Sequence, residues 1–522
     1  MSAKKSYDVV IVGAGPVGVF LGLSLAQRGH QAMVVERQPK PYPLPRAVHF
    51  DAEIARVLAA AGLGEDLKKL TQPATTYDWW NAEGKTLLHF DWSQMGVTGW
   101  PTTNMFCQPE LEAVLVQHAE AAGVSIIRGR EVVGVQQDND VASVTLDNGE
   151  QISGRYAVGC DGARSTVRER THLPMHWLGF TFDWLVIDLI PEKGYVWPHP
   201  VNLQICDPAR PTSAVSGGPN RRRFEFMRLP HETTAELETP EKAWELLEPW
   251  GIHPGNTKLE RAVVYRFEAG WAERWRDHRV LIAGDAAHRM PPFAGQGMCS
   301  GIRDAANLAW KLDMVLRGVS EDALLDSYDV ERIAHLQFAI EQSVALGNVI
   351  CVTDPEAVAA RDAAMLAGGG DPAVVLPPIA LPVLGPGLVH RVGGAVQPGA
   401  GNVALQPRIQ TPDGKVGLWD DVLGSGFDVV STVDLTGVLG AGRLGELERL
   451  GVRLNRVVPA GQPVPAGCVG DVDDVLLAHL REVGHEVIAV RPDGYLYGAV
   501  SADEACDFID ELCSQLRAAA GS

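Results

Sequence analysis

The sequence predicts an α/β fold with three parts: an open-sheet domain, a β-rich domain inserted into it, and a small α/β domain at the C-terminal end. Three observations support this prediction. A short β-branched run, 7–12, leads directly into a glycine-rich turn and an apolar helix. From about 181 to 267 the pattern becomes β-rich and aromatic. After 402, strand and helix patterns alternate again.

The length and charge of the chain limit what it can be. Its 522 residues suggest roughly two to four domains. Its 65 acidic and 45 basic side chains give a formal net charge of -20, which disfavours nucleic acid or an anionic membrane surface as a partner. No run reaches the ~18 uninterrupted apolar residues that a membrane span needs. The eight cysteines show no CxxC spacing and the N-terminus has no apolar signal segment, so we expect a cytoplasmic protein without a metal site.

The first glycine-rich turn has the spacing of a dinucleotide fingerprint. In Gly13-Ala14-Gly15-Pro16-Val17-Gly18, the first glycine makes the tight turn, the second admits a pyrophosphate and the third allows close helix packing. A second strand, 31–35, ends at Glu36, where a carboxylate can accept hydrogen bonds from ribose hydroxyls. This context predicts a bound adenine dinucleotide, and the alternative is a βαβ unit that binds no ligand.

Two arginines follow Glu36 in the sequence. Arg37 comes next, and Arg46 lies shortly before Asp51, which we expect to cap a helix running to about Ala61. A buried loop arginine beside a phosphate site can pair with a pyrophosphate or ribityl oxygen, although a plain surface arginine is the alternative. Gln108-Pro109 opens another predicted helix.

The middle of the chain is predicted to be mainly strands. Strands are expected at 125–127, 131–136, 142–146, 151–153 and 156–159, and the last runs into Cys160-Asp161-Gly162. The β-rich part that follows suits the roof of an apolar ligand site. The alternative is that its aromatic residues only pack the core of their own sheet.

A second glycine-rich loop spans residues 281–299. An apolar run ends at Gly284-Asp285, two prolines and two closely spaced glycines follow, and a helix is predicted from Ser300 to Leu316. Free backbone amides and the positive end of the helix dipole suit an anionic or electron-rich ring system. Taken alone, the loop is equally compatible with an ordinary strand-loop-helix connection.

The rest of the chain suggests a helix, a linker and a small domain. We predict a helix at about 322–347, one short helix near 355–366 within the linker, strands at 428–430 and 486–490, and helices at 475–483 and from Ala502. The cysteines of this last part lack CxxC spacing, which favours a packing or dimerisation module over a redox role.

Three motifs together resemble a known family. The GxGxxG turn with Glu36, Cys160-Asp161-Gly162 and Gly284-Asp285 occur in the order and at the separations of the FAD-dependent aromatic hydroxylases, flavoprotein monooxygenases related to p-hydroxybenzoate hydroxylase and phenol hydroxylase. The resemblance covers about 6–345 strongly and the tail more loosely. Segments 204–210, 221–227 and 292–298 most resemble the branch of 3-(3-hydroxyphenyl)propionate hydroxylase-like enzymes, and the tail is similar to the thioredoxin-like domain of that group.

The resemblance implies an FAD-binding Rossmann-like domain of the glutathione-reductase type. The implied domains are the first part of the FAD-binding domain (1–180), an inserted β-rich substrate-binding domain (181–268, with a contribution from about 75–105), the second part of the FAD-binding domain with its helices (269–350), a linker (351–401) and a thioredoxin-like C-terminal domain (402–522).

The resemblance also implies roles for individual residues. The glycine turn would hold the FAD pyrophosphate, Glu36 the adenosine ribose, Arg46 and Gln108 the phosphate and ribityl parts, and Asp285 the ribityl chain. Asp161 would serve both FAD and the transient NAD(P)H, and the loop 292–299 would line the isoalloxazine. The expected cofactor-binding residues are Gly13, Gly15, Pro16, Val17, Gly18, Glu36, Arg37, Arg46, Gln108, Asp161, Gly162, Gly284, Asp285, Pro292, Gly295, Gly297, Met298 and Cys299. Cys299 stands where this branch often has asparagine, so a side-chain contact from this position is in question.

The implied reaction is the hydroxylation of a phenol. NADH or NADPH would reduce the flavin, O2 would add at flavin C4a, and the resulting hydroperoxide would transfer oxygen to a ring carbon of the substrate. The substrate-facing candidates are His49, Arg210, Tyr265, Pro292 and Phe293, and no catalytic base is assigned.

Three hypotheses for the function remain open. The leading one is a catabolic enzyme for a 3-(3-hydroxyphenyl)propionate-like phenolic acid. The alternatives are a hydroxylase of a polycyclic polyketide or antibiotic, and a flavin-binding NAD(P)H oxidase or redox sensor without oxygenation. A small aromatic molecule is the expected partner, and a homodimer is one possible assembly.

Overall fold

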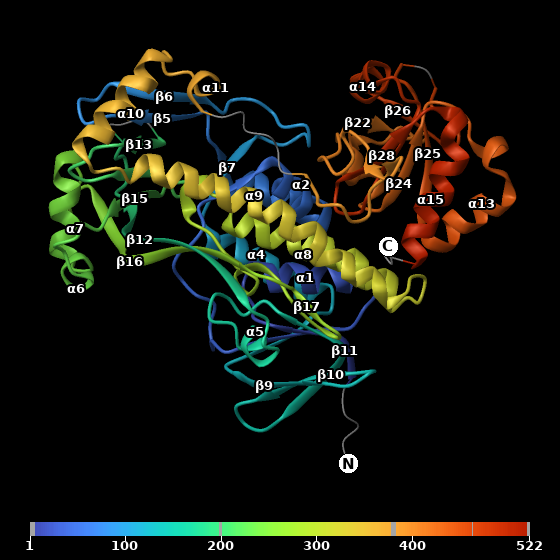
Figure 1. The fold of residues 1–522 in the computed structure, drawn as a ribbon, viewed down its shortest axis with the longest axis horizontal. Helices are drawn as coiled ribbons and strands as arrows, with labels where there is room; N and C mark the ends of the chain where they lie inside the picture. The colour runs from blue at the N-terminus through green and yellow to red at the C-terminus, as the bar shows by residue number, and fades with distance from the viewer. Residues whose placement is uncertain (1–5, 198–200, 377–382, 462, 519–522) are drawn as a thin grey trace.

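The computed structural model describes residues 6–197, 201–376, 383–461 and 463–518, and Figure 1 shows its ribbon. The first domain is built on a sheet with the strand order β17-β18-β11-β1-β2-β8, extended by β10 and β9 beside β11. Its strands are β1 (Ser6–Val12), β2 (Ala32–Glu36), β8 (Ser125–Arg128), β9 (Val132–Gln137), β10 (Ala142–Leu146), β11 (Gln151–Gly159), β17 (Arg276–Asp277) and β18 (Val280–Ile282). Because β18, β11, β1, β2 and β8 run parallel, their carboxyl ends meet at one edge of the sheet.

Helices cover this sheet, and one of them has the cap that the sequence predicted. Asp51 caps its helix as predicted, since its carboxylate accepts from the Ile54 N–H at 3.0 Å. The regular α-helix after Asp51 ends at Leu58, and a π-helical stretch follows in which Gly62 has a φ of 96°. The helices are α1 (Pro16–Gln27), α2 (Ala52–Leu58), η1 (Ala59–Leu63), α3 (Gly64–Leu70), α4 (Gln108–Ala121), α5 (Thr166–Arg170), η3 (Gly284–Ala286), η4 (Pro292–Ala294), α8 (Gly297–Leu316), η5 (Asp322–Asp326) and α9 (Ser327–Ile350).

One predicted strand break does not exist. Residues 151–153 and 156–159 were expected to be separate strands, but β11 is continuous from Gln151 to Gly159. Gly154 lies between them and pairs with Tyr7 on one side and Ala142 on the other. A Cβ at Gly154 would come within 3.2 Å of the Tyr7 carbonyl oxygen, so the glycine allows strands to approach closely rather than ending one.

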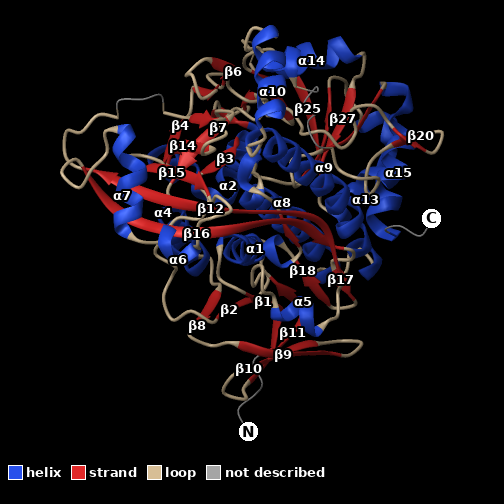
Figure 2. Ribbon diagram, turned by 60° about the vertical axis from the view of Figure 1, so that its left-hand side comes forward, coloured by secondary structure: helices blue, strands red, loops and turns tan. Residues whose placement is uncertain are grey.

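The second sheet forms a layer over the first domain, in the order β19-β16-β12-β15-β14-β13-β5-β6. Its two longest strands, β12 and β16, run side by side across the molecule in Figure 2 and extend beyond the expected range of 181–267 at both ends. The strands are β5 (Thr76–Trp80), β6 (Thr86–Asp91), β12 (Met175–Pro191), β13 (Leu203–Ile205), β14 (Thr212–Ser216), β15 (Arg222–Met227), β16 (Thr257–Ala272) and β19 (His288–Arg289). A smaller sheet contains β3 (His49–Asp51), β7 (Thr103–Phe106) and β4 (Thr71–Pro73).

The outer face of the second sheet is closed by short helices. Leu185, Ile187 and Leu189 alternate along β12 and pack in one apolar cluster with Leu237 and Leu247. The covering helices are α6 (Thr234–Leu237), α7 (Pro240–Leu247) and η2 (Glu248–Trp250). The intervening residues of β12, such as Trp184, Val186 and Asp188, therefore point to the inner face, toward the first domain.

The C-terminal domain has the thioredoxin-like arrangement of strands and helices. Its sheet has the order β23-β22-β26-β25-β24-β27-β28, with β24 and β25 parallel and with β27 and β28 antiparallel to their neighbours. The elements are β22 (Arg408–Gln410), β23 (Val416–Leu418), α12 (Trp419–Leu423), β24 (Phe427–Ser431), α13 (Thr436–Leu450), β25 (Val452–Pro459), β26 (Cys468–Asp471), α14 (Val475–Val483), β27 (Val487–Val490), β28 (Leu496–Val500), η6 (Ala502–Glu504) and α15 (Ala505–Ala518). Helix α13 was not predicted from the sequence, because it contains four glycines and is kinked at Gly440, where φ is 70°.

The segment between the domains has more structure than one helix. It contains α10 (Pro355–Ala367), α11 (Pro372–Val375) and a small hairpin of β20 (Arg391–Val392) and β21 (Ala395–Val396). Among the described residues, no single helix is both long and apolar enough to cross a membrane. Residues 322–350 and 355–367 reach that threshold only when taken together, and they are bent by 110°.

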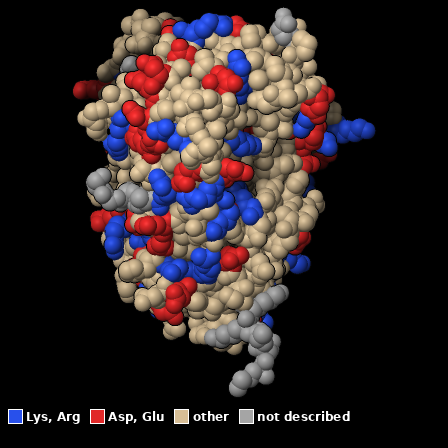
Figure 3. Space-filling model, turned by 90° about the vertical axis from the view of Figure 1, so that its right-hand side faces the viewer, with Lys and Arg blue, Asp and Glu red and all other residues tan. Residues whose placement is uncertain are grey.

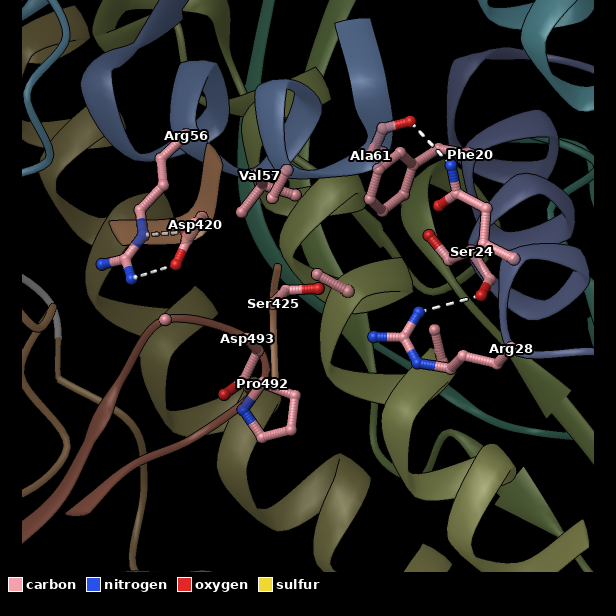
Figure 4. A pocket seen from close by; sticks show the side chains of 15 residues that line it. Phe20, Ser24, Arg28, Arg56, Val57, Ala61, Asp420, Ser425, Pro492 and Asp493 are labelled. Atoms are coloured by element: carbon pink, nitrogen blue, oxygen red, sulfur yellow. Dashed lines mark hydrogen bonds and ion pairs between the residues drawn. The ribbon is translucent and has the colours of Figure 1, made fainter. Parts of the chain in front are cut away.

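The C-terminal domain packs directly against the first domain. A cavity of about 40 Å³ lies between α1, the 56–61 segment and the C-terminal domain, and Figure 4 shows the side chains that line it. At its rim the Arg56 guanidinium donates to Asp420 at 2.7 Å, and it also donates to the Ala404 carbonyl oxygen at 2.8 Å. Both contacts join residues more than 300 positions apart in the sequence, so this domain is an integral part of the fold.

Candidate active site

The first glycine turn lies against the Cys160–Asp161 segment. The parallel pairing of β1 with β11 brings them together. A Cβ at Gly13 would lie 2.3 Å from the Cys160 carbonyl oxygen, and Gly13 has a φ of 106°. A Cβ at Gly18 would lie 2.1 Å from the Gly13 carbonyl oxygen. Both positions therefore require glycine because backbone atoms approach too closely for a side chain.

The Gly284-Asp285 motif contacts the same turn. A Cβ at Gly301, in the first turns of α8, would lie 2.6 Å from Val17 and 3.2 Å from the Gly284 Cα. The Gly284 N–H donates to the buried Asp304 carboxylate at 3.0 Å. His288 and Arg332 contact the same carboxylate at 2.8 and 2.9 Å. Although burial would raise the pKa of Asp304, these two partners hold it below its ordinary value. The three sequence motifs thus meet at one place.

The geometry around these motifs fits a bound dinucleotide. Helix α1 begins after Gly15 without a side-chain cap, and a Cβ at Gly15 or at Gly162 would meet no atom within 4 Å. Asp285 is exposed between the buried Gly284 and Ala286. Helix α8 also starts without a side-chain cap. Two helix N-termini with free amides and an exposed acid on the adjoining loop suit the pyrophosphate and ribityl hydroxyls of FAD.

Two of the predicted acidic residues also have structural partners. Glu36, at the end of β2, accepts hydrogen bonds from the Ala14 and Gln38 N–H groups, each at 2.8 Å. It therefore lies at the rim of the glycine turn. Asp161 accepts from the Ser165 hydroxyl at 2.5 Å and from the Val167 N–H at 3.1 Å, beside the start of α5. Burial raises its pKa, and these contacts oppose the rise.

The loop that contains Arg46 is held through its backbone. The Gln108 side-chain oxygen accepts from the N–H groups of Arg46 and Ala47 at 3.2 and 2.6 Å. Arg223 of the second sheet donates to the carbonyl oxygens of Arg46 and Pro45 at 2.6 and 3.0 Å. Gln108 thus shapes this loop, whereas Arg37 is exposed on the surface.

The loop 291–299 presses against β3. Gly295 has a φ of 66°, and a Cβ there would lie 2.7 Å from Nδ1 of His49. Burial lowers the pKa of His49, which favours a neutral imidazole. The Cys299 side chain is fully buried, with its Sγ 3.6 Å from the Gly295 carbonyl oxygen and 4.0 Å from that of His49. Its thiol therefore packs beneath the loop.

A polar cluster behind this loop was not predicted from the sequence. Arg303 on α8 donates to Gln296, Asp51 and Glu53 at 2.8, 2.6 and 2.8 Å. Tyr495 of the C-terminal domain donates to the other oxygen of Glu53 at 2.5 Å. The members lie far apart in sequence, so only their convergence in the fold identifies them.

Phe293 connects the loop to the second sheet. Its ring lies 5.6 Å from that of Trp184, 6.0 Å from Phe267 and 6.3 Å from Phe180, with steep interplanar angles in each case. Tyr265, on the inner face, accepts a hydrogen bond from Arg261 at 3.0 Å. Arg210 does not join this group through its guanidinium, which is held by Glu232 at 2.5 Å and by the Met227 carbonyl oxygen at 3.0 Å.

A cavity opens where the inner face meets the end of α9. It has a volume of about 490 Å³, which falls in the usual range for small-ligand sites. Phe182, Met227 and Cys351 line it, together with Asp183, which forms ion pairs with Arg228 and Arg266 at 2.8 and 2.9 Å. Within the described residues there is no group of three or more His, Cys, Asp or Glu side chains that could hold a metal ion.

Comparisons with known proteins agree with this geometry. The model of the FAD binding domain family matches residues 6–343, and that of the HcaD C-terminal domain matches 401–515. The chain is 35% identical over 529 residues to a probable NADH-specific resorcinol 4-hydroxylase of Rhodococcus jostii (strain RHA1), covering 98% of this chain and 95% of the relative. It is 33% identical over 538 residues to a 3-(3-hydroxy-phenyl)propionate/3-hydroxycinnamic acid hydroxylase of Mycolicibacterium gilvum (strain PYR-GCK), covering 100% and 94%.

Solved structures share the whole fold. An aklavinone-11 hydroxylase, in a complex with FAD and aklavinone, superposes with a TM-score of 0.79 at 22% identity over 99% of each chain. The OxyS anhydrotetracycline hydroxylase from Streptomyces rimosus superposes with a TM-score of 0.75 at 25% identity over 99% of this chain and 100% of that one.

Proposed function

The chain belongs to the FAD binding domain family, and from this premise we propose that its substrate is a phenol with a second substituent meta to the hydroxyl group. The protein is an FAD-dependent aromatic hydroxylase, so the resemblance based on the three motifs is confirmed. The names of the two relatives support the proposed substrate, because resorcinol and 3-(3-hydroxyphenyl)propionate both carry a group meta to a phenolic hydroxyl. We also propose NADH as the reductant, after the name of the first relative.

The contact of Phe293 with the inner face of the second sheet carries the proposal. Because the 291–299 loop and the sheet meet through aromatic rings, a planar substrate between them would be surrounded by apolar surface. When bound, FAD supplies the hydride acceptor and the oxygen-activating chemistry. The protein holds the ring in place and keeps water from the reacting atoms.

Several of the predicted cofactor contacts have structural features that support them, although Arg37 has none because it is exposed on the surface. We propose that the N-termini of α1 and α8 hold the pyrophosphate and the flavin ring, and that Asp285 accepts from the ribityl chain. We also propose that Glu36 binds the adenosine ribose, and that Arg46 lies near the phosphates. Cys299 would contribute only its backbone, because its side chain is buried under the loop.

The charges on the inner face favour a neutral phenol. Arg261 and Arg223 lie beside the Asp188 carboxylate at 2.5 and 2.8 Å, and Glu225 lies 3.7 Å from Arg223. Two cations thus face two carboxylates, so a substrate carboxylate would find no surplus positive charge in this group. We therefore expect resorcinol to be hydroxylated more efficiently than 3-(3-hydroxyphenyl)propionate.

A substrate panel tests these proposals. Purified protein with FAD, NADH and O2 is given resorcinol, 3-(3-hydroxyphenyl)propionate and anhydrotetracycline, and both NADH consumption and product mass are measured. A product heavier by one oxygen atom from either phenol supports the proposal, whereas turnover of anhydrotetracycline alone would favour the polycyclic alternative. NADH consumption that yields only H2O2 with every compound would favour an oxidase.

Assembly and location are also proposals. We propose a cytoplasmic protein, which the absence of disulfides among its eight cysteines supports, since all eight lie in the described part of the chain. Figure 3 shows acidic and basic side chains interspersed over one face of the molecule. The homodimer stays a prediction, and light scattering of the purified protein tests it.

A further inference from the structure

Three polar side chains form a row across the inner face of the second sheet. Glu225 on β15 pairs in register with Ser213 on β14, which pairs with Gln204 on β13. On the other side Glu225 pairs with Val186 of β12. Because residues directly opposite each other point to the same face, Glu225, Ser213 and Gln204 share the face of Val186. We refer to these three residues as the polar row.

The polar row lies between two loops of the first domain. On one side, Trp184 lies two residues before Val186 on β12 and contacts Phe293 of the 291–299 loop. On the other side, Asp188 follows two residues after Val186 on β12 and accepts a hydrogen bond from Arg223. Arg223 also donates to the carbonyl oxygens of Pro45 and Arg46. The two loops expected to contact the flavin therefore flank the row, which is where the substrate ring would lie.

Glu225 is the least satisfied member of the row. In the described structure its carboxylate accepts no hydrogen bond, and its cationic neighbour is Arg223, at 3.7 Å. Arg223 instead directs its hydrogen bonds to Asp188 and the loop carbonyls. Glu225 is also the only partly exposed residue within β15, whose other members are all buried. Its side chain is 15% exposed in a strand whose other residues are buried, so a ligand can reach it.

The other residues of this face are less suited to accept a proton. Tyr77 and Tyr265 are phenols whose pKa values are raised by burial, so they remain protonated. Gln204 donates to the Thr212 carbonyl oxygen at 3.0 Å, and its amide has no basic nitrogen. Asp188 is occupied by two arginines. Among the side chains of this face, the Glu225 carboxylate, which accepts no hydrogen bond in the described structure, is the remaining base.

We propose that Glu225 is a catalytic residue that accepts the proton of the substrate's phenolic hydroxyl. This inference rests on the proposed function. The phenol O–H bond breaks, the proton passes to a carboxylate oxygen of Glu225, and the electron pair stays on the phenolate oxygen. The phenolate donates electron density to its ortho and para carbons, which makes them better acceptors of oxygen. No electron leaves the substrate in this step.

The surroundings of Glu225 support this role. Burial raises its pKa, and Asp188 raises it further, while Arg223 and Arg261 lower it. Tyr77, Tyr265 and Cys206 are further titratable groups near it on this sheet, and Tyr42 and Arg46 of the first domain lie beside Tyr265. A raised pKa brings a carboxyl group closer to neutral pH, where a general base is most effective. Activity should therefore fall as the pH drops through the pKa of Glu225.

The test compares three variants with the wild type. Glu225→Gln removes the base while keeping the shape, and Glu225→Asp keeps a shorter base. Glu245→Gln changes an exposed glutamate on α7 and serves as a control. For resorcinol, we expect kcat/KM of Glu225→Gln to fall about 100-fold or more, with loss of the acidic limb of the pH profile. Glu225→Asp should keep that limb at reduced activity, and Glu245→Gln should match the wild type.

A binding measurement separates this inference from the proposed function. 4-Nitrophenol changes colour when it ionises, so its difference spectrum reports whether the bound phenol has lost its proton. At a pH where the free compound is protonated, we expect ionised 4-nitrophenol on the wild type and the neutral form on Glu225→Gln. Identical spectra, or a Glu225→Gln variant with the wild-type pH profile and activity, would overturn the role of Glu225. A wild type that hydroxylates no phenol, but ionises bound 4-nitrophenol through Glu225, would overturn the proposed function alone.

Discussion

Arg491 of the C-terminal domain donates to both carboxylate oxygens of Glu331 on α9, at 2.9 and 2.8 Å, and neither side chain is exposed. Lys311 on α8 also contacts Glu331, at 2.7 Å, and is equally buried. Asp493 accepts from Arg491 at 2.8 Å and from Asn307 at 2.9 Å. Two cations and two carboxylates therefore neutralise each other where the C-terminal domain meets the first domain.

Glu331→Gln should destabilise the protein strongly at neutral pH. The substitution leaves Arg491 and Lys311 buried with only Asp493 as an anion, and breaking a buried ion pair costs about 3–5 kcal/mol. Although burial alone would raise the pKa of Glu331, Arg491 and Lys311 hold it well below its ordinary value of 4.5. The carboxylate's stabilising contribution is thus complete above pH 4.5 and is lost as the pH falls below it.

The pH dependence of the stability difference between wild type and Glu331→Gln is the control for this prediction. Thermal unfolding of wild type and Glu331→Gln should differ most near neutral pH. The difference should narrow as the pH falls below 4.5, because the carboxylate of the unfolded wild type becomes protonated there while that of the folded protein, whose pKa is well below 4.5, stays ionised. A gap that is independent of pH would show that the variant acts through packing rather than charge.

Tyr495→Phe should weaken FAD binding without unfolding the protein. The hydroxyl links the C-terminal domain to Glu53, and Glu53 binds Arg303, which holds Gln296 next to the 291–299 loop. Loss of one hydrogen bond costs roughly 1 kcal/mol, or about fivefold in the dissociation constant of FAD if the loop carries the whole effect. Fluorescence titration measures this constant. Tyr497→Phe is the matched control, because the buried Tyr497 hydroxyl has no hydrogen-bond partner in the described structure. Equal affinities in both variants would argue against the link.

Most of the first domain could be predicted from the sequence because its signals are local. The turn Gly13–Gly18 and the capping residue Asp51 specify their own conformations through neighbouring residues. The site was predictable where it depends on such motifs, as at Gly284. Glu225 and Arg303 gave no local signal, since their roles come from strand register and from contacts more than 200 residues away.

The contacts of the C-terminal domain with the first domain also could not be predicted from the sequence. Cysteine spacing suggested a packing or dimerisation module. The role of the buried Arg491 and Asp493 is visible only in the structure, where Arg491 donates to Glu331 and Asp493 accepts from Asn307. Removing the chain after Gly401 would take Arg491 away from Glu331 and Asp493 away from Asn307, so we expect loss of the folded first domain as well.

Asp285→Ala should reduce the amount of FAD that remains bound after purification. The side chain is exposed on η3 next to the buried Gly284, and the change removes a hydrogen-bond acceptor for the ribityl hydroxyls. The ratio of flavin absorbance to protein absorbance measures the occupancy. Asp140→Ala, at an exposed turn remote from the motifs in sequence, should retain wild-type occupancy. Full occupancy in Asp285→Ala would show that this acid does not bind the cofactor.

Cys299→Ala should leave the reaction almost unchanged while lowering stability. The thiol is fully buried beneath the loop, and burial raises its pKa far above neutral, so it remains a protonated thiol that packs as a small apolar group. Removing the sulfur leaves a small void, which costs on the order of 1 kcal/mol. Cys299→Asn introduces the residue that the family resemblance leads us to expect at this position, and its larger amide must fit between the carbonyl oxygens of Gly295 and His49. We expect its melting temperature to fall further than that of Cys299→Ala. A large loss of kcat in Cys299→Ala at wild-type FAD content would instead mean that the thiol acts in the reaction.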